Sequence, residues 1–478
     1  MNVVSKGWLV LGFLGGLTWA EAGGAAQAGL PLGDRSAGET EGVDQRASEC
    51  KVAVFSSDAT PALGKPIYPS YKPLETIEEP LLAKGVVLQA GSNRYVLCAV
   101  DWCVLANSSH ELFREKLAKA VQTPKEYVSV HTVHQHTAPH MNGDAQRLLD
   151  KYPPAPQQVD FAFLEEAADR AAKAAQQALE HLEPFDRVGL GQAKVQQVAS
   201  NRRILRDGKL VGRMSSCTDP ALRAEPEGKI DPYLKTISLA RGDKVLVRLH
   251  YYATHPQSFY GDPRASSDVP GFARQRLEKK EGVFQIYFTG CAGDVAMGKY
   301  NDGTPQARDG LTDRLYKAME ESISATRWEP VGPVVWKMAP VKLPARTDPP
   351  LEKTRQMVED TNLPPLTRMY AACRWAYAER VDRPIDISLF QIGPAWVLLL
   401  PGECMIDFQL YAQSLVPDRF LAVAAYGDDG PSYICTEASY KEGGYEPSAS
   451  HLAPEVEHLL KQAIRSLLGI QIPAAKNP

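Results

Sequence analysis

The chain has 478 residues and a formal net charge of −4 at pH 7, with 44% hydrophobic and 23% charged residues. These proportions are typical of a folded globular protein, and the length allows one large domain or two. The weak negative charge and the lack of a basic tract argue against a nucleic-acid footprint, so we expect no nucleic-acid partner.

The first 28 residues predict a signal peptide. Lys6 precedes an apolar run from Trp8 to Ala20, and two A-x-A cleavage patterns follow, ending at Ala22 and Ala28. The run is too short for a permanent membrane span, although an uncleaved anchor is the alternative. We therefore expect export to the periplasm or the medium. Residues 29–49 have the composition of a flexible linker, which leaves residues 50–478 as the folded domain.

From residue 52 onward, segments with strand and helix patterns follow one another. We expect strands at residues 52–56, 85–90, 95–102, 127–133, 185–198, 236–241, 244–252, 283–288, 333–343, 384–392, 396–400 and 421–426. We expect helices at residues 108–122, 159–182, 271–280, 306–323, 405–414 and 454–468, and one more helix between the strands at 333–343 and 384–392. The sequence therefore predicts an α/β fold, with mixed sheets and helices packed on them, in a single large domain.

The eight cysteines are widely spaced and form no C-x-x-C pair, which excludes a zinc ribbon and a thioredoxin-type motif. In an exported chain, some of them could pair.

Four of the ten histidines lie in one short segment, where an expected strand ends in a loop: His131, His134, His136 and His140. His134 and His136 are two residues apart, so on an extended backbone their side chains share one face. They could bind a metal together, or one could bind it while the other transfers protons. A polar loop with incidental histidines is the alternative.

Other polar residues follow later strands. His255 ends the strand at 244–252, whereas His250 lies inside it and is expected to be structural. Glu403 follows an apolar strand, where it could favour a helix dipole or complete a metal site. Asp428, Asp429 and Tyr433 follow the strand at 421–426.

Three familiar hydrolase and nucleotide motifs are excluded. The segment GDVAMGKY (293–300) fits a P-loop except at Tyr300, where Ser or Thr must stand, so its glycines more plausibly allow close backbone approach. H-E-x-x-H and G-x-S-x-G are both lacking, which excludes a standard zincin and an α/β-hydrolase elbow. A metal site assembled from distant strand ends remains, and mixed N/O ligands are typical of catalytic zinc.

These clusters, in this order, resemble the catalytic domain of the neutral/alkaline non-lysosomal ceramidases. The matching segments between about residues 52 and 445 are DATP (58–61), HQHTAP (134–139), ATHPQS (253–258), GDV (293–295), PGE (401–403) and YICT (433–436). Each motif is short, and their order makes the resemblance specific.

The resemblance implies one Zn²⁺ per chain, with His134, His255, Glu403 and Tyr433 as ligands. It makes His136 the proton-handling histidine of the H-x-H pair. In the segment ASNRRI it implies that Arg202 lies near the substrate carbonyl, with Arg203 as the less favoured candidate. Zinc and an arginine could then share the negative charge of a tetrahedral intermediate.

The chain also departs from the family pattern. Thr137 and Ala138 replace Ser-Gly, and Ala296 replaces the serine of GDVS, which favours metal-activated water over a covalent serine. The family's C-terminal β-sandwich, which shapes ceramide recognition, is expected to be missing.

The expected function is therefore an exported zinc-dependent hydrolase that cleaves an amide bond, in an N-acyl lipid or another small amide. A lipid substrate would bring a peripheral membrane contact. The alternatives are an ester hydrolase that uses the same zinc site, and a non-catalytic exported binding protein with a decayed site. The oligomeric state does not follow from the sequence.

Overall fold

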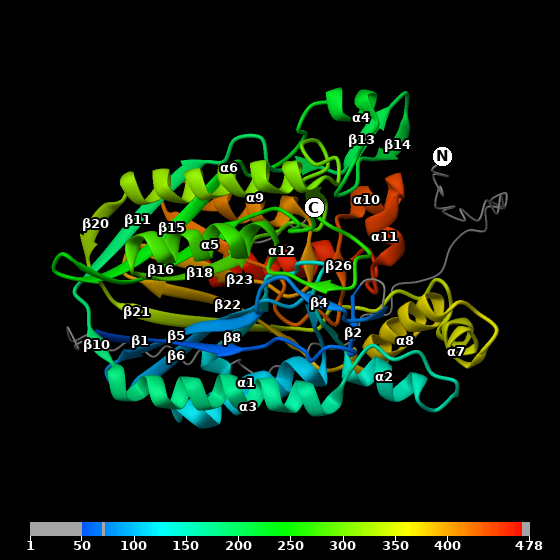
Figure 1. The fold of residues 1–478 in the computed structure, drawn as a ribbon, viewed down its shortest axis with the longest axis horizontal. Helices are drawn as coiled ribbons and strands as arrows, with labels where there is room; N and C mark the ends of the chain where they lie inside the picture. Colours follow the sequence, from blue (N-terminus) through cyan, green and yellow to red (C-terminus); the bar gives the residue numbers. More distant parts are fainter. Residues whose placement is uncertain (1–49, 69–71, 471–478) are drawn as a thin grey trace, which may run out of the picture. The chain divides into compact units, whose positions relative to one another are not determined.

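The computed structural model describes residues 50–68 and 72–470 (Figure 1). The predicted signal peptide (1–28) and linker (29–49) lie outside these residues. Within the described ranges, every helix is too short or too polar to cross a membrane. The described residues form α helices and several β sheets, which confirms the predicted mixed α/β class.

Three sheets form the framework. The first has the order β10-β1-β5-β6-β8, from β10 (Glu183–Pro184), β1 (Cys50–Asp58), β5 (Leu82–Ala90), β6 (Asn93–Val100) and β8 (Val128–Thr132). The second has the order β18-β16-β15-β11-β20, from β18 (Phe284–Thr289), β16 (Lys244–Tyr252), β15 (Tyr233–Arg241), β11 (Arg187–Lys194) and β20 (Arg327–Pro330). The third has the order β21-β22-β23-β25, from β21 (Val334–Val341), β22 (Ile385–Ile392), β23 (Ala395–Leu399) and β25 (Phe420–Ala424).

Each sheet is antiparallel except at one edge, where two strands run parallel: β6 with β8, β16 with β18, and β23 with β25. The ends of the three edge strands are hydrogen-bonded to one another. The Ala425 N–H donates to the Thr289 carbonyl (2.9 Å), and the Thr289 hydroxyl donates to the Val133 carbonyl (2.7 Å). The carboxyl ends of three parallel pairs therefore meet at one place, where open sheets commonly bind ligands.

Helices cover the outer faces of the sheets. α1 (Ser108–Val121) and α3 (Phe161–Ala178) pack side by side against the first sheet, and α5 (Asp268–Glu281) and α6 (Pro305–Ser324) against the second (Figure 1). α12 (Val456–Leu467) packs on the third sheet and on α9 (Ile406–Leu415). Alanines at 167, 168, 171 and 175 lie on the buried face of α3, as helical spacing requires.

The predicted helix between β21 and β22 is in fact a pair, α7 (Leu351–Glu359) and α8 (Pro365–Arg380), which pack on each other. Pro364 and Pro365 separate them, because proline favours a helix start and disfavours a continuing helix. α2 (Gly143–Leu149) packs on α8, and α11 (Tyr445–Ala449) lies near the chain end. The sequence patterns did not indicate α2 or α11. All eight cysteines are buried and unpaired.

Candidate metal centre

His134 is the first residue of the site after β8. Its backbone φ is +71°, a left-handed value that costs energy for a residue with a Cβ and is common at functional sites. The backbone N–H donates to the Trp102 carbonyl (2.9 Å), and the ring Nδ1 lies 2.7 Å from the Cys103 carbonyl oxygen. A carbonyl oxygen only accepts, so Nδ1 carries a proton. This leaves Nε2 as the ring nitrogen whose lone pair can bind a metal.

His255 is held in the same way after β16. Its Nδ1 lies 2.6 Å from the Ala292 carbonyl oxygen, so Nδ1 is again the donor and Nε2 the lone pair. Histidines that bind metals usually donate their other ring N–H to a carbonyl or carboxylate, which orients the ring. His255 is fully buried, and burial, followed by the charge of Arg202, lowers its pKa to about 4.

Glu403 reaches the site from β24 (Glu403–Cys404), which pairs in parallel with β26 (Tyr433–Ile434). Gly293 lets its own segment lie close against β24, because a Cβ at this position would lie 2.4 Å from the Glu403 carbonyl oxygen. Asp294 accepts hydrogen bonds from the Ile406 N–H (2.8 Å) and the Asn201 side chain (2.7 Å). The GDV segment thus fixes the backbone behind Glu403, which confirms the expected close approach.

The three side chains meet in a triangle of atoms. His134 Nε2 and His255 Nε2 are 3.1 Å apart, and Glu403 Oε2 lies 3.2 Å from the first and 3.1 Å from the second. Four tetrahedral ligands with bonds of about 2.0–2.1 Å are separated by about 3.3 Å, so this spacing fits zinc coordination.

The hydrogen bonds that orient the two imidazoles also favour a cation between the three donor atoms. Two imidazole lone pairs and a carboxylate oxygen face one another, and without a cation or protons among them they would repel one another. Burial alone would raise the pKa of Glu403, whereas positive charge on the rings of His134 and His255 would hold it well below its ordinary value, and a metal ion between the three groups would supply that charge instead. The residues present therefore fit a metal ion with two nitrogen ligands and one oxygen ligand.

His136 lies beside the triangle, its ring centroid 5.0 Å from that of His134 and 5.6 Å from that of His255. It is buried, and neither ring nitrogen has a hydrogen-bond partner among the described residues. Burial and the neighbouring His134 and His255 lower its pKa well below the ordinary value. An imidazole with two free nitrogens next to a metal site can accept and donate a proton. Cys103 lies within 4.8 Å of the ring nitrogens of His134 and His136.

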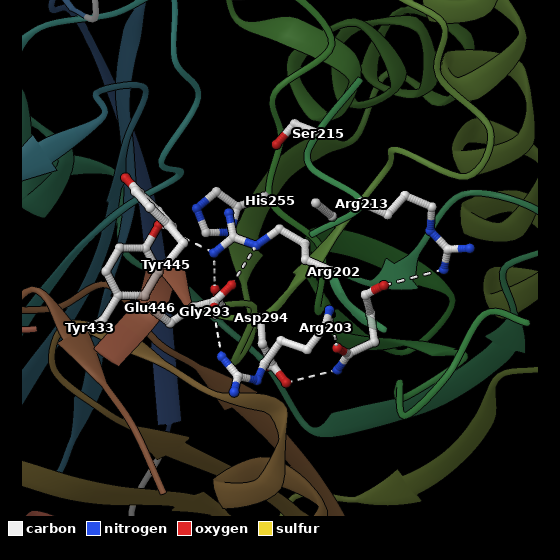
Figure 2. A network of polar contacts seen from close by, with 12 residues as sticks. Arg202, Arg203, Arg213, Ser215, His255, Gly293, Asp294, Tyr433, Tyr445 and Glu446 are labelled. Atoms are coloured by element: carbon white, nitrogen blue, oxygen red, sulfur yellow. Dashed lines mark hydrogen bonds and ion pairs between the residues drawn. The ribbon is translucent and has the colours of Figure 1, made fainter. Parts of the chain in front are cut away.

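Tyr433 and Arg202 lie on the other side of the site. The Arg202 guanidinium donates to the Gly293 carbonyl and lies 3.3 Å from the Tyr433 hydroxyl, and its Nε pairs with Glu446 at 3.2 Å (Figure 2). Burial would lower the pKa of Arg202, but Tyr433 and Glu446 raise it above its ordinary value. The positively charged Arg202 guanidinium is thus held in place next to the Tyr433 hydroxyl.

Arg203 points elsewhere. Its guanidinium pairs with Glu446 (2.7 Å) and with Glu442 (2.9 Å), and Figure 2 shows it extending away from His255. Of the two arginines in ASNRRI, Arg202 is therefore the one that reaches Tyr433.

A cavity of about 400 Å³ opens from the metal-binding residues, a size typical of small-molecule sites. Its lining includes His134, His136, Glu403 and Tyr433, together with residues of α7, α8 and the 448–451 segment. The sequence patterns did not indicate the helical wall of this cavity, which includes Met357, Tyr370, Ala371 and Arg374. No spacing pattern marked these residues, because they lie on helices that do not follow a site-forming strand.

The remaining histidines of the first cluster differ. His131 is bonded to the Ala425 carbonyl (2.7 Å) and to Ser129 (2.8 Å), which is a structural arrangement. His140, the last histidine of the cluster, lines the cavity. His250 is bonded to Thr236 (2.9 Å) and Gln285 (2.8 Å), as expected for a structural residue.

The fold that holds this site is the neutral ceramidase fold. The crystal structure of neutral ceramidase from Pseudomonas aeruginosa matches with a TM-score of 0.66 at 16% identity, covering 91% of this chain and 77% of that chain. A structure described as ceramidase complexed with C2 matches with a TM-score of 0.65 at 16% identity, covering 90% and 77%. No family model and no curated protein sequence matches the chain. The predicted resemblance is thereby confirmed at the level of the fold.

Proposed function

We propose that this protein is a zinc-dependent hydrolase that cleaves an amide bond. One observation carries the proposal: three donor atoms from His134, His255 and Glu403 come within 3.2 Å of one another. Their segments are far apart in the chain, and the lone pairs face one another at the head of a cavity. Zinc in such a site supplies a Lewis acid and lowers the pKa of a bound water to about 7.

The chain's own residues then have distinct tasks. His134, His255 and Glu403 hold the metal, and we propose Tyr433, which is in register with Glu403, as its fourth ligand. His136 takes the proton of the attacking water and delivers it to the leaving amine, because its ring nitrogens have no other partner. Arg202 stabilises negative charge on the carbonyl oxygen from behind Tyr433.

An amide is the preferred substrate because the fold is shared with ceramidases, whose name denotes amide cleavage in an N-acyl lipid. The substrate proposed here is an N-acyl lipid or another small amide, and export would place the enzyme outside the cytoplasm. An ester hydrolase with the same site is the second candidate. Matched amide and ester substrates with one acyl group distinguish the two by their kcat/KM values.

The direct test is metal analysis of the purified protein beside amide hydrolysis. We expect about one zinc per chain, activity lost on chelation and activity regained with added zinc. The matched variants are His255→Ala, which removes a ligand, and His181→Ala, which changes an exposed histidine on the surface. Equal metal content in both variants would contradict the proposed metal site. Full zinc with no turnover of any amide or ester would favour a binding protein.

A further inference from the structure

The helical wall of the cavity carries a positive charge. Arg374 lies on α8 and lines the cavity. Of the described residues that line it, Arg374 is the one lysine or arginine. The same lining includes Glu403, whose charge a bound zinc ion would offset.

Arg374 is not neutralised by the protein. Its printed hydrogen bond goes from Nη2 to the Pro349 carbonyl (3.1 Å), and none of the described carboxylates forms an ion pair with it. Burial and the nearby cation Arg346 lower its pKa to about 10, with a weak opposing effect of Asp348, so it is charged at neutral pH. A half-buried guanidinium without a carboxylate partner is available to pair with a carboxylate of a bound ligand.

Asp348, which is not part of the lining, favours the charged form of Arg374, but the ionisable lining groups other than Glu403 add no further negative charge. His451 lines it, with Nδ1 2.9 Å from the Gly430 carbonyl oxygen, and burial lowers its pKa to about 4, which leaves it neutral. Burial, Glu403 and Asp428 raise the pKa of Asp429, the other acidic lining residue, well above its ordinary value. Arg346 is bonded to backbone carbonyls, including that of Pro447 (2.7 Å), and thus adds positive charge behind the wall.

The rest of the wall suits an apolar chain. Met357, Tyr370, Ala371 and Ala449 line the same cavity. Tyr370 is also partly exposed at its surface. A ligand that fills the cavity therefore meets a metal site, an apolar wall and one unpaired guanidinium.

We propose that the substrate is an amide that carries a carboxylate, as an N-acyl amino acid does, and that Arg374 binds this carboxylate. This inference rests on the proposed function and narrows its substrate class to amides that carry a negative charge. The reaction is unchanged: water adds across the C–N bond, which breaks to give a carboxylic acid and an amine, and the anchoring carboxylate takes no part. Arginine suits the role because its planar group can form two parallel hydrogen bonds to a carboxylate.

The test compares anionic substrates with neutral counterparts of nearly the same shape. One pair is N-octanoylglycine and N-octanoylglycinamide, with the charge on the amine side of the scissile bond. The second pair is the N-butyl monoamide of octanedioic acid and its terminal primary amide, with the charge on the acyl side, and butylamine release is measured. We expect the wild type to prefer the anionic member of at least one pair by about tenfold or more in kcat/KM.

Variants assign this preference to Arg374. In Arg374→Gln the anionic-to-neutral ratio of kcat/KM should fall by about tenfold, and Arg374→Lys should retain part of it. Arg355→Gln is the matched control, since Arg355 is also half-buried and stacks on Trp375, outside the cavity lining. A neutral preference in both pairs, or an unchanged ratio in Arg374→Gln, would overturn the inference.

A binding measurement separates this inference from the proposed hydrolysis. Calorimetric titration of metal-free protein with N-octanoylglycine should show binding that is weaker by about tenfold in Arg374→Gln and unchanged in Arg355→Gln. If no amide is hydrolysed but this difference holds, the proposed function fails and the carboxylate site stands. If hydrolysis is observed without any charge preference, the proposed function stands and the carboxylate site fails. Thermal unfolding of each variant identifies loss of fold.

Discussion

The candidate metal centre, here called the metal end of the cavity, and the helical wall of the same cavity are built differently. At the metal end, His134 and His255 follow parallel strands, and carbonyl oxygens of other loops hold their rings. On the helical wall, Arg374 lies on α8 and donates to one carbonyl of the described backbone. The metal end is thus set by many backbone bonds and admits little variation, whereas the helical wall can change residue by residue. A conserved reaction with a variable substrate is the expected result of such a division.

The sharpest test of the metal end is removal of a ligand. Glu403→Gln should reduce bound zinc and amide hydrolysis by more than the roughly 10–100-fold cost of losing an outer hydrogen-bond partner. The amide keeps the size of the side chain but removes the charge that balances the two imidazoles. Metal analysis and kcat/KM check this, and near-normal zinc content in the variant would remove Glu403 from the ligand set.

Replacement of His136 should separate proton transfer from metal binding. In His136→Ala we expect kcat to fall by about 10²–10⁴-fold while about one zinc per chain remains. The reason is that His136 lies beside the triangle of donor atoms and is not part of it, its ring centroid being 5.0 Å from that of His134 and 5.6 Å from that of His255. If zinc is lost together with activity, His136 is a ligand and the two histidines of the pair have the same role.

Replacement of each of the two adjacent arginines should have a smaller effect on activity and should distinguish their roles. Arg202→Gln should lower kcat by about tenfold to hundredfold with little change in KM, because Arg202 acts on Tyr433 behind the reacting carbonyl. Arg203→Gln removes ion pairs with Glu442 and Glu446 and should affect thermal stability more than kcat. Partial rescue by Arg202→Lys would support a charge effect. Equal kcat losses at both positions would indicate a structural role for the pair.

The last expected effect concerns the stability of the whole fold, which should depend on pH, rather than the reaction. Burial lowers the pKa of His131, His250 and His451 to about 4, from 6.5. The unfolded chain therefore binds protons that the folded chain excludes, so stability is fully present above pH 6.5 and is lost as pH falls toward 4. Each imidazole should cost about 2 kcal/mol at pH 5. Urea unfolding at pH 7.5 and pH 5 measures this, and equal midpoints would contradict it.

Local sequence patterns predicted most of the framework. The alternation of apolar residues placed β15, β16 and α6 within a few residues of their ends. The patterns failed where the structure depends on distant partners. For example, the Ser108 N–H donates to the Asp144 side chain, 36 positions later, and the residues around Ser108 do not indicate this partner. The pair of short helices around Pro364 was predicted as one helix, because apolar periodicity does not show how two helices pack.

For the site, the sequence by itself determined which chemical groups follow the strands: His134 and His136 after one, and His255, Glu403 and Tyr433 after others. The tertiary structure alone decided which of them converge. Convergence depends on three sheet edges meeting, through bonds such as that from the Ala425 N–H to the Thr289 carbonyl. The positive charge in the cavity lining was also decided there. Arg374 is one of many arginines in the sequence, and only packing leaves it without a carboxylate partner.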